Sequence, residues 1–471
     1  MKIVGRKKEV LDLRDYVAAD QPDFLVVYGR RRVGKTYLIR EFFDDKFCFY
    51  TTGLAQADKT EQLKEFNSAL NRYGTKKYDI ASDWFTTFHQ LRDLIETSPT
   101  DGKKVVFLDE MPWMDTHRSG FLSGLESFWN GWGSGRSDLL LIACGSATSW
   151  ITNKLFRNLG GLYNRVTKRM HLAPFTLSEC EEFYKSNGVV YSRQQIVESY
   201  MIFGGIPYYM NQVERHLSLS QNVDRLCFKT GGQLTDEYDT LYSSLYEYPE
   251  KHMRIVNALG DKAMGLTRSE IIDATGLTNS GALTKTLTEL EDCGFIRKYY
   301  GYGKKSRDAV YQLIDFFSLF YLKYMRDKNH IDEDFWVTNL QSGQMNAWSG
   351  YAFEQVCLCH IHQIKKALGI SGISSSVYSW RSKVANPGAQ VDLVIDRRDG
   401  VINLCEMKYS NKEYTITKKY DGELRNKQSA FYSETKTRKT LHNTFVTTYG
   451  LNHNEYWGSI QSEVTMDDLF E

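Results

Sequence analysis

The sequence predicts an α/β protein of several domains, and three stretches of the chain carry this prediction. Residues 24–43 run from an apolar stretch through a glycine-rich turn into an amphipathic stretch, which predicts a strand, a loop and a helix. Residues 249–313 predict three helices and two strands, and residues 391–408 predict a strand hairpin with acidic residues and a lysine. A chain of 471 residues exceeds one ordinary core, so we expect about two to four domains.

The overall composition is typical of a water-soluble globular protein, with 42% hydrophobic residues, 25% charged residues and a net charge of +1. This charge argues against a wholly basic nucleic-acid binder, although local basic patches fit it. No apolar run has the length of a membrane span, the N-terminus lacks the apolar core of a signal peptide, and the eight cysteines are scattered. We therefore expect a cytoplasmic protein with reduced thiols and no membrane partner.

The glycine-rich turn matches the pattern G-x-x-x-x-G-K-T from Gly29 to Thr36. In such a loop the backbone amides surround phosphates, the lysine reaches the β- and γ-phosphates, and the threonine hydroxyl binds Mg²⁺. Lys35 and Thr36 are the residues in those two positions, and the strand before and the helix after argue against a chance match. The residues expected to bind ATP in this segment are Gly29, Arg30, Arg31, Arg32, Val33, Gly34, Lys35, Thr36 and Tyr37.

Two further apolar strands end in polar residues. "KKVVFLDE" ends in Asp109 and Glu110, where Asp109 can hold Mg²⁺ and Glu110 can polarise the attacking water. "DLLLIACGS" ends in Ser146, which either lies beside the γ-phosphate or belongs to an ordinary turn. Because parallel strands place their carboxyl ends at one edge of a sheet, the three strands predict an ATP and Mg²⁺ site there.

Six segments occur in an order that resembles a known family: "IVGRKKEVLDL", "GRRRVGKT", "VVFLDE", "CGSATSW", "NRVTKRMHLAPFTLSEC" and "FGGIPYYM". This order resembles the archaeal-type ATPase family of the AAA+/STAND class. The resemblance implies a P-loop NTPase core in residues 1–175 and a helical lid in residues 176–248. It also places near the adenine the N-terminal residues Gly5, Arg6, Glu9 and Leu13.

The resemblance further makes Arg165 a γ-phosphate sensor, although Asn164 stands where the family has glycine. Arg165 as an ordinary helix-surface residue is the alternative. The "GGIP" segment from Gly204 to Pro207 resembles the lid motif of the family, and a simple helix-ending turn is the alternative.

Residues 249–325 have the pattern of a winged helix-turn-helix. One helix ends near Gly260, Thr267 caps a second, a third follows a glycine-containing turn, and a basic hairpin closes the segment. Such a module can place its third helix in the major groove of DNA. In the ATPases that the chain resembles it also works as an internal regulatory domain. The candidate DNA contacts are Lys285, Lys304, Lys305 and Arg307.

The hairpin "VDLVIDRRDGVINLCEMK" carries Asp392, Glu406 and Lys408, and the last two leave the same face of a strand. With Glu354 on a preceding helix, the order resembles the PD-(D/E)xK nuclease fold and the C-terminal domain that accompanies this ATPase family. The resemblance implies a restriction-endonuclease-like α/β domain in residues 326–471. Asp392 and Glu406 would bind Mg²⁺ or Mn²⁺ with help from Glu354, while Lys408 would orient the attacking water. A decayed core, with Glu406 and Lys408 as a plain ion pair, is the alternative.

The segment 408–439 holds nine Lys/Arg against four Asp/Glu, interleaved with tyrosines, which suits a phosphate backbone or a solvated face. Gln428 is either a supporting polar residue or a surface residue. The leading hypothesis is an ATP-regulated, metal-dependent DNA nuclease in defence or mobile-DNA maintenance, with ATP and DNA as partners and a homo-oligomer left open. One alternative is a nucleotide-switched DNA- or protein-binding regulator with an inactive nuclease fold. Another is a transcription regulator that acts through the winged helix.

Overall fold

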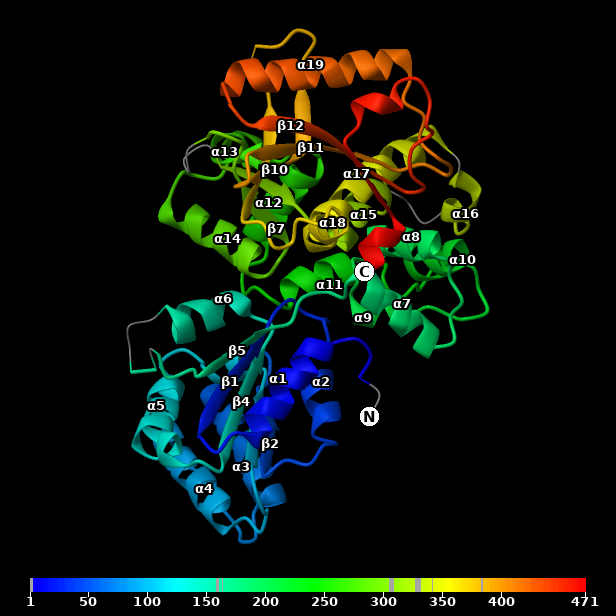
Figure 1. Cartoon of the computed structure of the whole chain (residues 1–471). Helices are drawn as coiled ribbons and strands as arrows, with labels where there is room; N and C mark the ends of the chain where they lie inside the picture. The colour runs from blue at the N-terminus through cyan, green and yellow to red at the C-terminus, as the bar shows by residue number, and fades with distance from the viewer. Residues whose placement is uncertain are drawn as a thin grey trace. The chain divides into compact units, whose positions relative to one another are not determined.

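The computed structural model describes residues 3–157, 161–162, 164–304, 309–326, 332–340, 342–382 and 384–471. These residues form two compact units (Figure 1). The first comprises Met1–Pro174 with Thr288–Cys293, and the second comprises Phe175–Leu287 with Gly294–Glu471. In the described ranges, no helix combines the length and the apolar composition that crossing a bilayer requires.

The first unit is built on a five-stranded sheet in the order β2-β3-β4-β1-β5, and every neighbouring pair is parallel. The parallel α/β sheet predicted from the sequence is therefore confirmed. Its strands are β1 (Asp23–Tyr28), β2 (Phe49–Thr52), β3 (Lys104–Asp109), β4 (Leu139–Gly145) and β5 (Lys168–His171). Its helices are α1 (Lys7–Ala18), α2 (Lys35–Phe42), α3 (Lys59–Tyr73), α4 (Trp84–Thr97), α5 (Phe121–Gly131) and α6 (Thr148–Ile151).

The central strands are buried on both faces, which explains their continuous apolar sequence. In β1, Phe24 and Val26 pack in one cluster with Trp84 of α4 and Phe121 of α5. Leu25 lies between them in the strand, so its side chain points to the opposite face of the sheet. The sheet is thus a rigid platform whose carboxyl edge carries the polar residues.

The second unit begins with the helices α7 (Leu177–Ser186), α8 (Arg193–Phe203), α9 (Pro207–Met210), α10 (Leu219–Val223) and α11 (Glu237–Ser243). Capping boxes start three of them, as at Thr176 and Glu179 of α7. Gly204 and Gly205 end α8 with φ of 64° and 66°. A Cβ on Gly205 would lie 2.3 Å from the carbonyl oxygen of Phe175, so this turn requires glycine.

The middle of the unit contains α12 (Glu250–Gly260), α13 (Arg268–Thr275) and the first part of α14 (Gly281–Asp292), whose residues from Thr288 onwards are assigned to the first unit. Thr267 caps α13 in a capping box with Glu270. An antiparallel sheet in the order β6-β8-β7 is formed by β6 (Leu266–Thr267), β7 (Ile296–Tyr299) and β8 (Val310–Leu313). Two helices, α15 (Phe316–Tyr324) and α16 (Phe335–Asn339), follow.

The last part of the unit is a mixed sheet in the order β13-β12-β11-β10-β9. β9 (Ser375–Arg381), β10 (Gln390–Arg397) and β11 (Val401–Lys408) are antiparallel, whereas β12 (Thr440–Thr447) and β13 (Ser462–Thr465) continue parallel to β11. The helices are α17 (Gly343–Cys359), α18 (Ile361–Ala367) and α19 (Lys418–Thr435). α19 connects β11 to β12 and packs through Phe431 on one face of the sheet (Figure 1).

Candidate functional site

The glycine-rich loop joins β1 to α2 in the first unit. Gly29 has a φ of 143°, and a Cβ there would lie 2.3 Å from the carbonyl oxygen of Leu172. Lys35 begins α2, is almost fully buried, and donates hydrogen bonds of 3.0 Å to the carbonyl oxygens of Gly29 and Arg30. The ammonium group therefore lies inside the curve of the loop, where the phosphates of a nucleotide would replace these carbonyls as its partners.

The acidic pair at the end of β3 faces this loop. The Thr36 hydroxyl donates to Asp109 Oδ1 at 3.1 Å, which brings together the two residues predicted to hold Mg²⁺. Burial, followed by the neighbouring Glu110 carboxylate, raises the pKa of Asp109 above its ordinary value. A divalent cation would offset both effects, since it favours the ionised carboxylate.

Glu110 lies just beyond Asp109 in the left-handed backbone region, with a φ of 43°. Its carboxylate accepts hydrogen bonds from the Ser146 amide at 3.1 Å and from the Ser146 hydroxyl at 3.0 Å. Ser146 lies in a bend after β4 and holds the residue that would polarise water, while its position beside the γ-phosphate stays a prediction. The neighbouring positions of β3 and β4 in the sheet produce this contact.

The other predicted ATP-site residues are placed as follows. Arg30 is buried, Arg31 and Arg32 are half-buried, Val33 is buried, and Tyr37 is exposed in the first turn of α2. Arg165 is an exposed surface residue in a turn that follows Leu162, and it does not lie on a helix. Its role as a γ-phosphate sensor stays a prediction.

Two further residues lie around the loop, and His171 is the one that the sequence analysis did not identify. Arg6, which the family resemblance places near the adenine, donates through Nη2 to the carbonyl oxygen of Val33 at 3.1 Å. His171, at the end of β5, lies with its ring centroid 5.1 Å from that of Tyr28. Burial, then Lys35 and Arg6, lower the pKa of His171. Its position at a strand end, next to a strand that leads into the loop, is the signal that could have identified it.

In the second unit the predicted acidic residues come from three elements. Asp392 is on β10 where the register with β9 shifts between Val391 and Val394, an irregularity that re-aims side chains. Glu406 is buried on β11, and Glu354 is on α17, which packs against β11. The Gln390 side-chain amide donates to Asp392 Oδ1 at 2.6 Å.

The three carboxyl groups are close enough to perturb one another. Burial, followed by Asp392, raises the pKa of Glu354 to about 8. Burial, followed by Glu406, raises the pKa of Asp392. Lys408 and Lys427 oppose both shifts. Such a cluster of mutually repelling carboxyls beside lysines is typical of a functional site.

Lys427 is the residue that the sequence interpretation missed. Its Nζ lies 2.6 Å from Glu406 Oε1, whereas Lys408 Nζ is 3.8 Å from Glu406 Oε2. The Tyr420 hydroxyl donates to Oε2 at 2.7 Å. The nearest ammonium group of Glu406 is therefore on α19, next to the half-buried Gln428 that the sequence singled out. Lys427 follows Tyr420 by seven positions, which is about two helical turns, so both lie on one helix face, and this spacing was the available signal.

The donor set fits a hard divalent cation. Asp392 and Glu406 offer carboxylate oxygens, which Mg²⁺ and Mn²⁺ prefer, and an incoming water or phosphate can complete the coordination. Among the described residues, no group of three or more His, Cys, Asp or Glu side chains is arranged to hold a metal ion. A divalent cation at this position would have Asp392 and Glu406 as its protein ligands, and Glu354 would act on it from nearby.

The structure describes two of the four residues predicted to contact DNA. Lys285 on α14 and Lys304 after β7 are exposed, while Lys305 and Arg307 lie outside the described residues. Tyr302, at the base of the predicted wing, donates its amide to the Ser379 carbonyl at 2.8 Å and its ring lies 5.1 Å from that of Phe431. This base is thus fixed on the C-terminal sheet.

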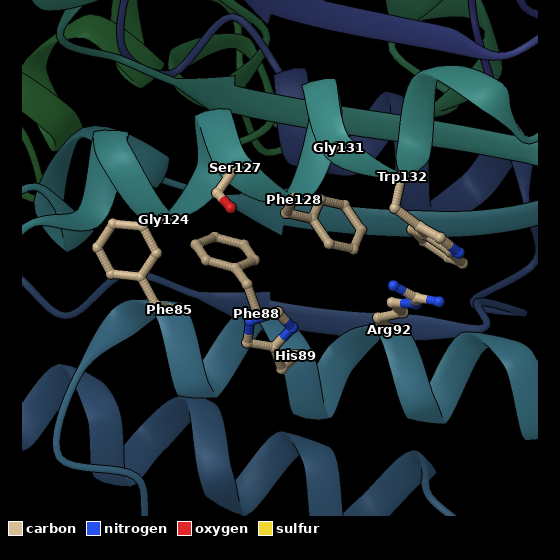
Figure 2. A pocket seen from close by; sticks show the side chains of 9 residues that line it. All are labelled: Phe85, Phe88, His89, Arg92, Gly124, Ser127, Phe128, Gly131 and Trp132. Carbon is tan, nitrogen blue, oxygen red and sulfur yellow. The ribbon is translucent and has the colours of Figure 1, made fainter.

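A small pocket of about 130 Å³ lies between α4 and α5 in the first unit (Figure 2). Figure 2 shows Phe85, Phe88 and Phe128 along it and Arg92 facing Trp132. The Arg92 guanidinium carbon is 5.6 Å from the Trp132 ring centroid. The pocket contains none of the residues that the sequence predicted to bind ATP or metal.

A parallel α/β sheet with this loop, the buried lysine and the acidic pair at its carboxyl edge defines a P-loop ATPase domain. Residues 3–213 match the model of an ATPase domain found predominantly in Archaea. The match includes the loop, Asp109, Glu110, Ser146 and Arg165. Residues 3–213 are thus similar to an archaeal-type ATPase domain, the family that the sequence motifs resemble.

Three proteins illustrate the likeness. An uncharacterized protein of Methanocaldococcus jannaschii is 24% identical over 424 residues, which cover 88% of this chain and 90% of that protein. The Walker-type ATPase of Pyrococcus abyssi is similar in structure, with a TM-score of 0.49, 17% identity, and coverage of 68% of this chain and 96% of that chain. For the ORC2 protein of Aeropyrum pernix the TM-score is 0.42, with 14% identity and coverage of 68% and 92%.

Proposed function

We propose that this protein hydrolyses ATP in its first unit and uses the nucleotide state to control a metal-dependent DNA nuclease-like site in its second unit. The observation that supports the second part best is the cluster of Glu354, Asp392, Glu406 and Lys408 at one end of the mixed sheet. Carboxylates that can hold a divalent cation, with a lysine beside them, can activate water and stabilise the charge that develops when a phosphodiester is cleaved.

In the ATPase unit, Lys35 would neutralise the β- and γ-phosphates, and Thr36 and Asp109 would hold Mg²⁺. The metal would screen the phosphate charge. Glu110 would orient and polarise the attacking water once its hydrogen bonds with Ser146 rearrange. The Glu110–Ser146 contact supports this role, because it holds the carboxylate in one position before ATP and the attacking water are bound.

In the nuclease-like site, Asp392 and Glu406 would bind Mg²⁺ or Mn²⁺, which lowers the pKa of a bound water. Lys408 would orient that water and stabilise the negative charge that develops on the phosphate. The Lys408 ammonium lies 5.1 Å from the Tyr420 ring centroid, an arrangement that restrains it on the Glu406 face of β11. We expect DNA as the substrate, because the segment 408–439 carries excess positive charge.

Contacts inside the second unit support coupling between the lid helices and the nuclease-like site. The Tyr409 hydroxyl, next to Lys408, donates to Glu198 of α8 at 2.7 Å. His360, at the end of the helix that carries Glu354, accepts the Leu177 amide of α7 at 3.1 Å. A displacement of α7 or α8 would therefore act directly on the elements that position the acidic residues.

The His360 contact predicts a pH dependence of stability. Because Nε2 accepts a hydrogen bond, the ring must stay neutral, and burial lowers its pKa from 6.5 to about 4. The unfolded chain binds the proton first, so this stabilisation is complete above pH 6.5 and is lost as the pH falls towards 4. At about pH 5 we expect a loss of about 2 kcal/mol relative to about pH 7, measured by urea unfolding of this unit. His360→Gln should lack this component, and an equal pH dependence in both proteins contradicts the assignment.

The wing gives a second testable feature. Exchanging Lys304 and Lys305 for Glu should weaken DNA binding by about tenfold and reduce its salt dependence, if the wing contacts the phosphate backbone. Fluorescence anisotropy at several salt concentrations measures both effects. The matched control is Lys323→Glu, on α15. Unchanged affinity of the wing variant would leave the winged helix as an internal regulatory module.

The test of the function is to incubate the protein with single-stranded, duplex and branched DNA, with Mg²⁺ or Mn²⁺, and with or without ATP. Metal-dependent cleavage that Asp392→Ala abolishes supports the proposal. The absence of cleavage under every condition refutes the nuclease activity. A nucleotide-switched regulator with an inactive nuclease fold would then take its place, and the anchoring of Tyr302 on the C-terminal sheet favours that second function.

A further inference from the structure

Lys427 occupies an unusual position on α19. The residues that face the sheet along this helix are spaced three and four apart: Tyr420, Leu424, Lys427 and Phe431. Leu424 and Phe431 are buried, and the Lys427 side chain is only 20% exposed. A lysine in such a stripe loses much of its hydration, so its charge must be compensated by a specific partner.

That partner is the carboxylate predicted to bind metal. Lys427 contacts Glu406 Oε1, and Tyr420 donates to Oε2, so both oxygens of Glu406 already have a close partner from α19. The Lys427 ammonium also opposes the upward pKa shifts of Glu354 and Asp392, so its positive charge favours the ionised form of all three carboxyls. A divalent cation held by Asp392 and Glu406 would compete with this ammonium group for the same oxygens.

We propose that Lys427 is an internal counterion of the metal site. A divalent cation must displace the Lys427 ammonium group from Glu406 in order to bind. Lys427 thereby sets the cation concentration at which the site fills. This inference rests on the proposed metal site and adds a threshold to it. Lys408 differs, because its Nζ is 3.8 Å from Glu406 and leaves the carboxylate oxygens more accessible.

The experiment compares four full-length proteins in nucleotide-free form at alkaline pH: wild type, Lys427→Met, Lys419→Met, and Lys427→Met combined with Asp392→Asn. Mn²⁺ is titrated into each, and free Mn²⁺ is counted by electron paramagnetic resonance. Methionine keeps the length of the side chain and removes its charge. Lys419 is an exposed lysine of the same helix and serves as the matched control.

We expect Lys427→Met to bind Mn²⁺ about tenfold more tightly than wild type, since a close positive charge is removed. Lys419→Met should match wild type, and the Asp392→Asn combination should lose the gain. In chelator, Lys427→Met should melt at a lower temperature than wild type, and Mn²⁺ should raise its melting temperature by more. If Lys427→Met does not fold, Lys427→Gln replaces it in both measurements.

If Lys427→Met binds Mn²⁺ no more tightly than wild type, the inference is wrong. This holds even if the wild-type protein cleaves DNA, so the inference can fail while the nuclease activity stands. Tighter binding by Lys427→Met supports it, also when no protein of the series cleaves DNA and the nuclease activity itself fails. If none of the four proteins binds Mn²⁺, both the proposed metal site and the counterion role of Lys427 are wrong.

Discussion

ATP binding should fall by about 10- to 100-fold when Lys35 is replaced by alanine, because the phosphates lose the ammonium group held inside the loop. Lys35 is buried inside the loop, and its ammonium group points at the carbonyl oxygens of Gly29 and Arg30. Titration with a fluorescent ATP analogue measures the effect. Lys46→Ala is the matched control, since Lys46 is exposed in the same unit and pairs with Asp44.

Glu110→Gln separates binding from hydrolysis at the same site. The substitution keeps the shape of the side chain and its hydrogen-bonding capacity towards Ser146, and it removes the charge that polarises water. We expect ATP affinity to stay within a few-fold of wild type while hydrolysis falls by about 100-fold. Hydrolysis at the wild-type rate would show that another group polarises the water.

DNA cleavage should fall by about 100-fold or more in each of Asp392→Ala, Glu406→Ala and Lys408→Ala, while ATP hydrolysis stays within a few-fold of wild type. The first two substitutions remove carboxylates that bind the metal, so Mn²⁺ should bind more weakly. Lys408→Ala should keep Mn²⁺ binding, because an ammonium group is no metal ligand. A nuclease assay and a Mn²⁺ titration on the same preparations therefore distinguish the two roles.

The control for this series is Lys323→Ala, which removes an exposed lysine of α15 that lies outside the basic segment 408–439. It should cleave DNA like the wild type. Loss of Mn²⁺ binding in Lys408→Ala would contradict the assigned role and indicate that this residue only maintains the local structure.

The local elements of the ATP site could be predicted from the sequence because short-range patterns determine them. The apolar run, the two glycines and the amphipathic stretch of residues 24–43 became β1, the loop and α2. The parallel sheet followed from three such strands. The contact of Glu110 with Ser146 could not be predicted in this way, since it depends on β3 and β4 being neighbours in the sheet.

The nuclease-like site shows the same limit more clearly. Glu354, Asp392, Glu406 and Lys408 were chosen from their order along the chain, and the packing of α17 on β11 and the pairing of β10 with β11 bring their elements together. Lys427 was missed because its role depends on how α19 is rotated about its own axis relative to the sheet. A rotation of this kind is set by packing residues such as Phe431, whose partners are distant in sequence.

β11 has an antiparallel neighbour on one side and a parallel neighbour on the other. A parallel pair requires a crossover connection, and here that connection contains α19. Insertions before α19, in residues 409–417, would leave the phase of the helix unchanged. One residue inserted between Tyr420 and Lys427 would instead turn the lysine by about 100° relative to the tyrosine. The connection can therefore vary in length before α19 during evolution. The spacing within the helix is constrained, because it places the Lys427 ammonium group beside Glu406.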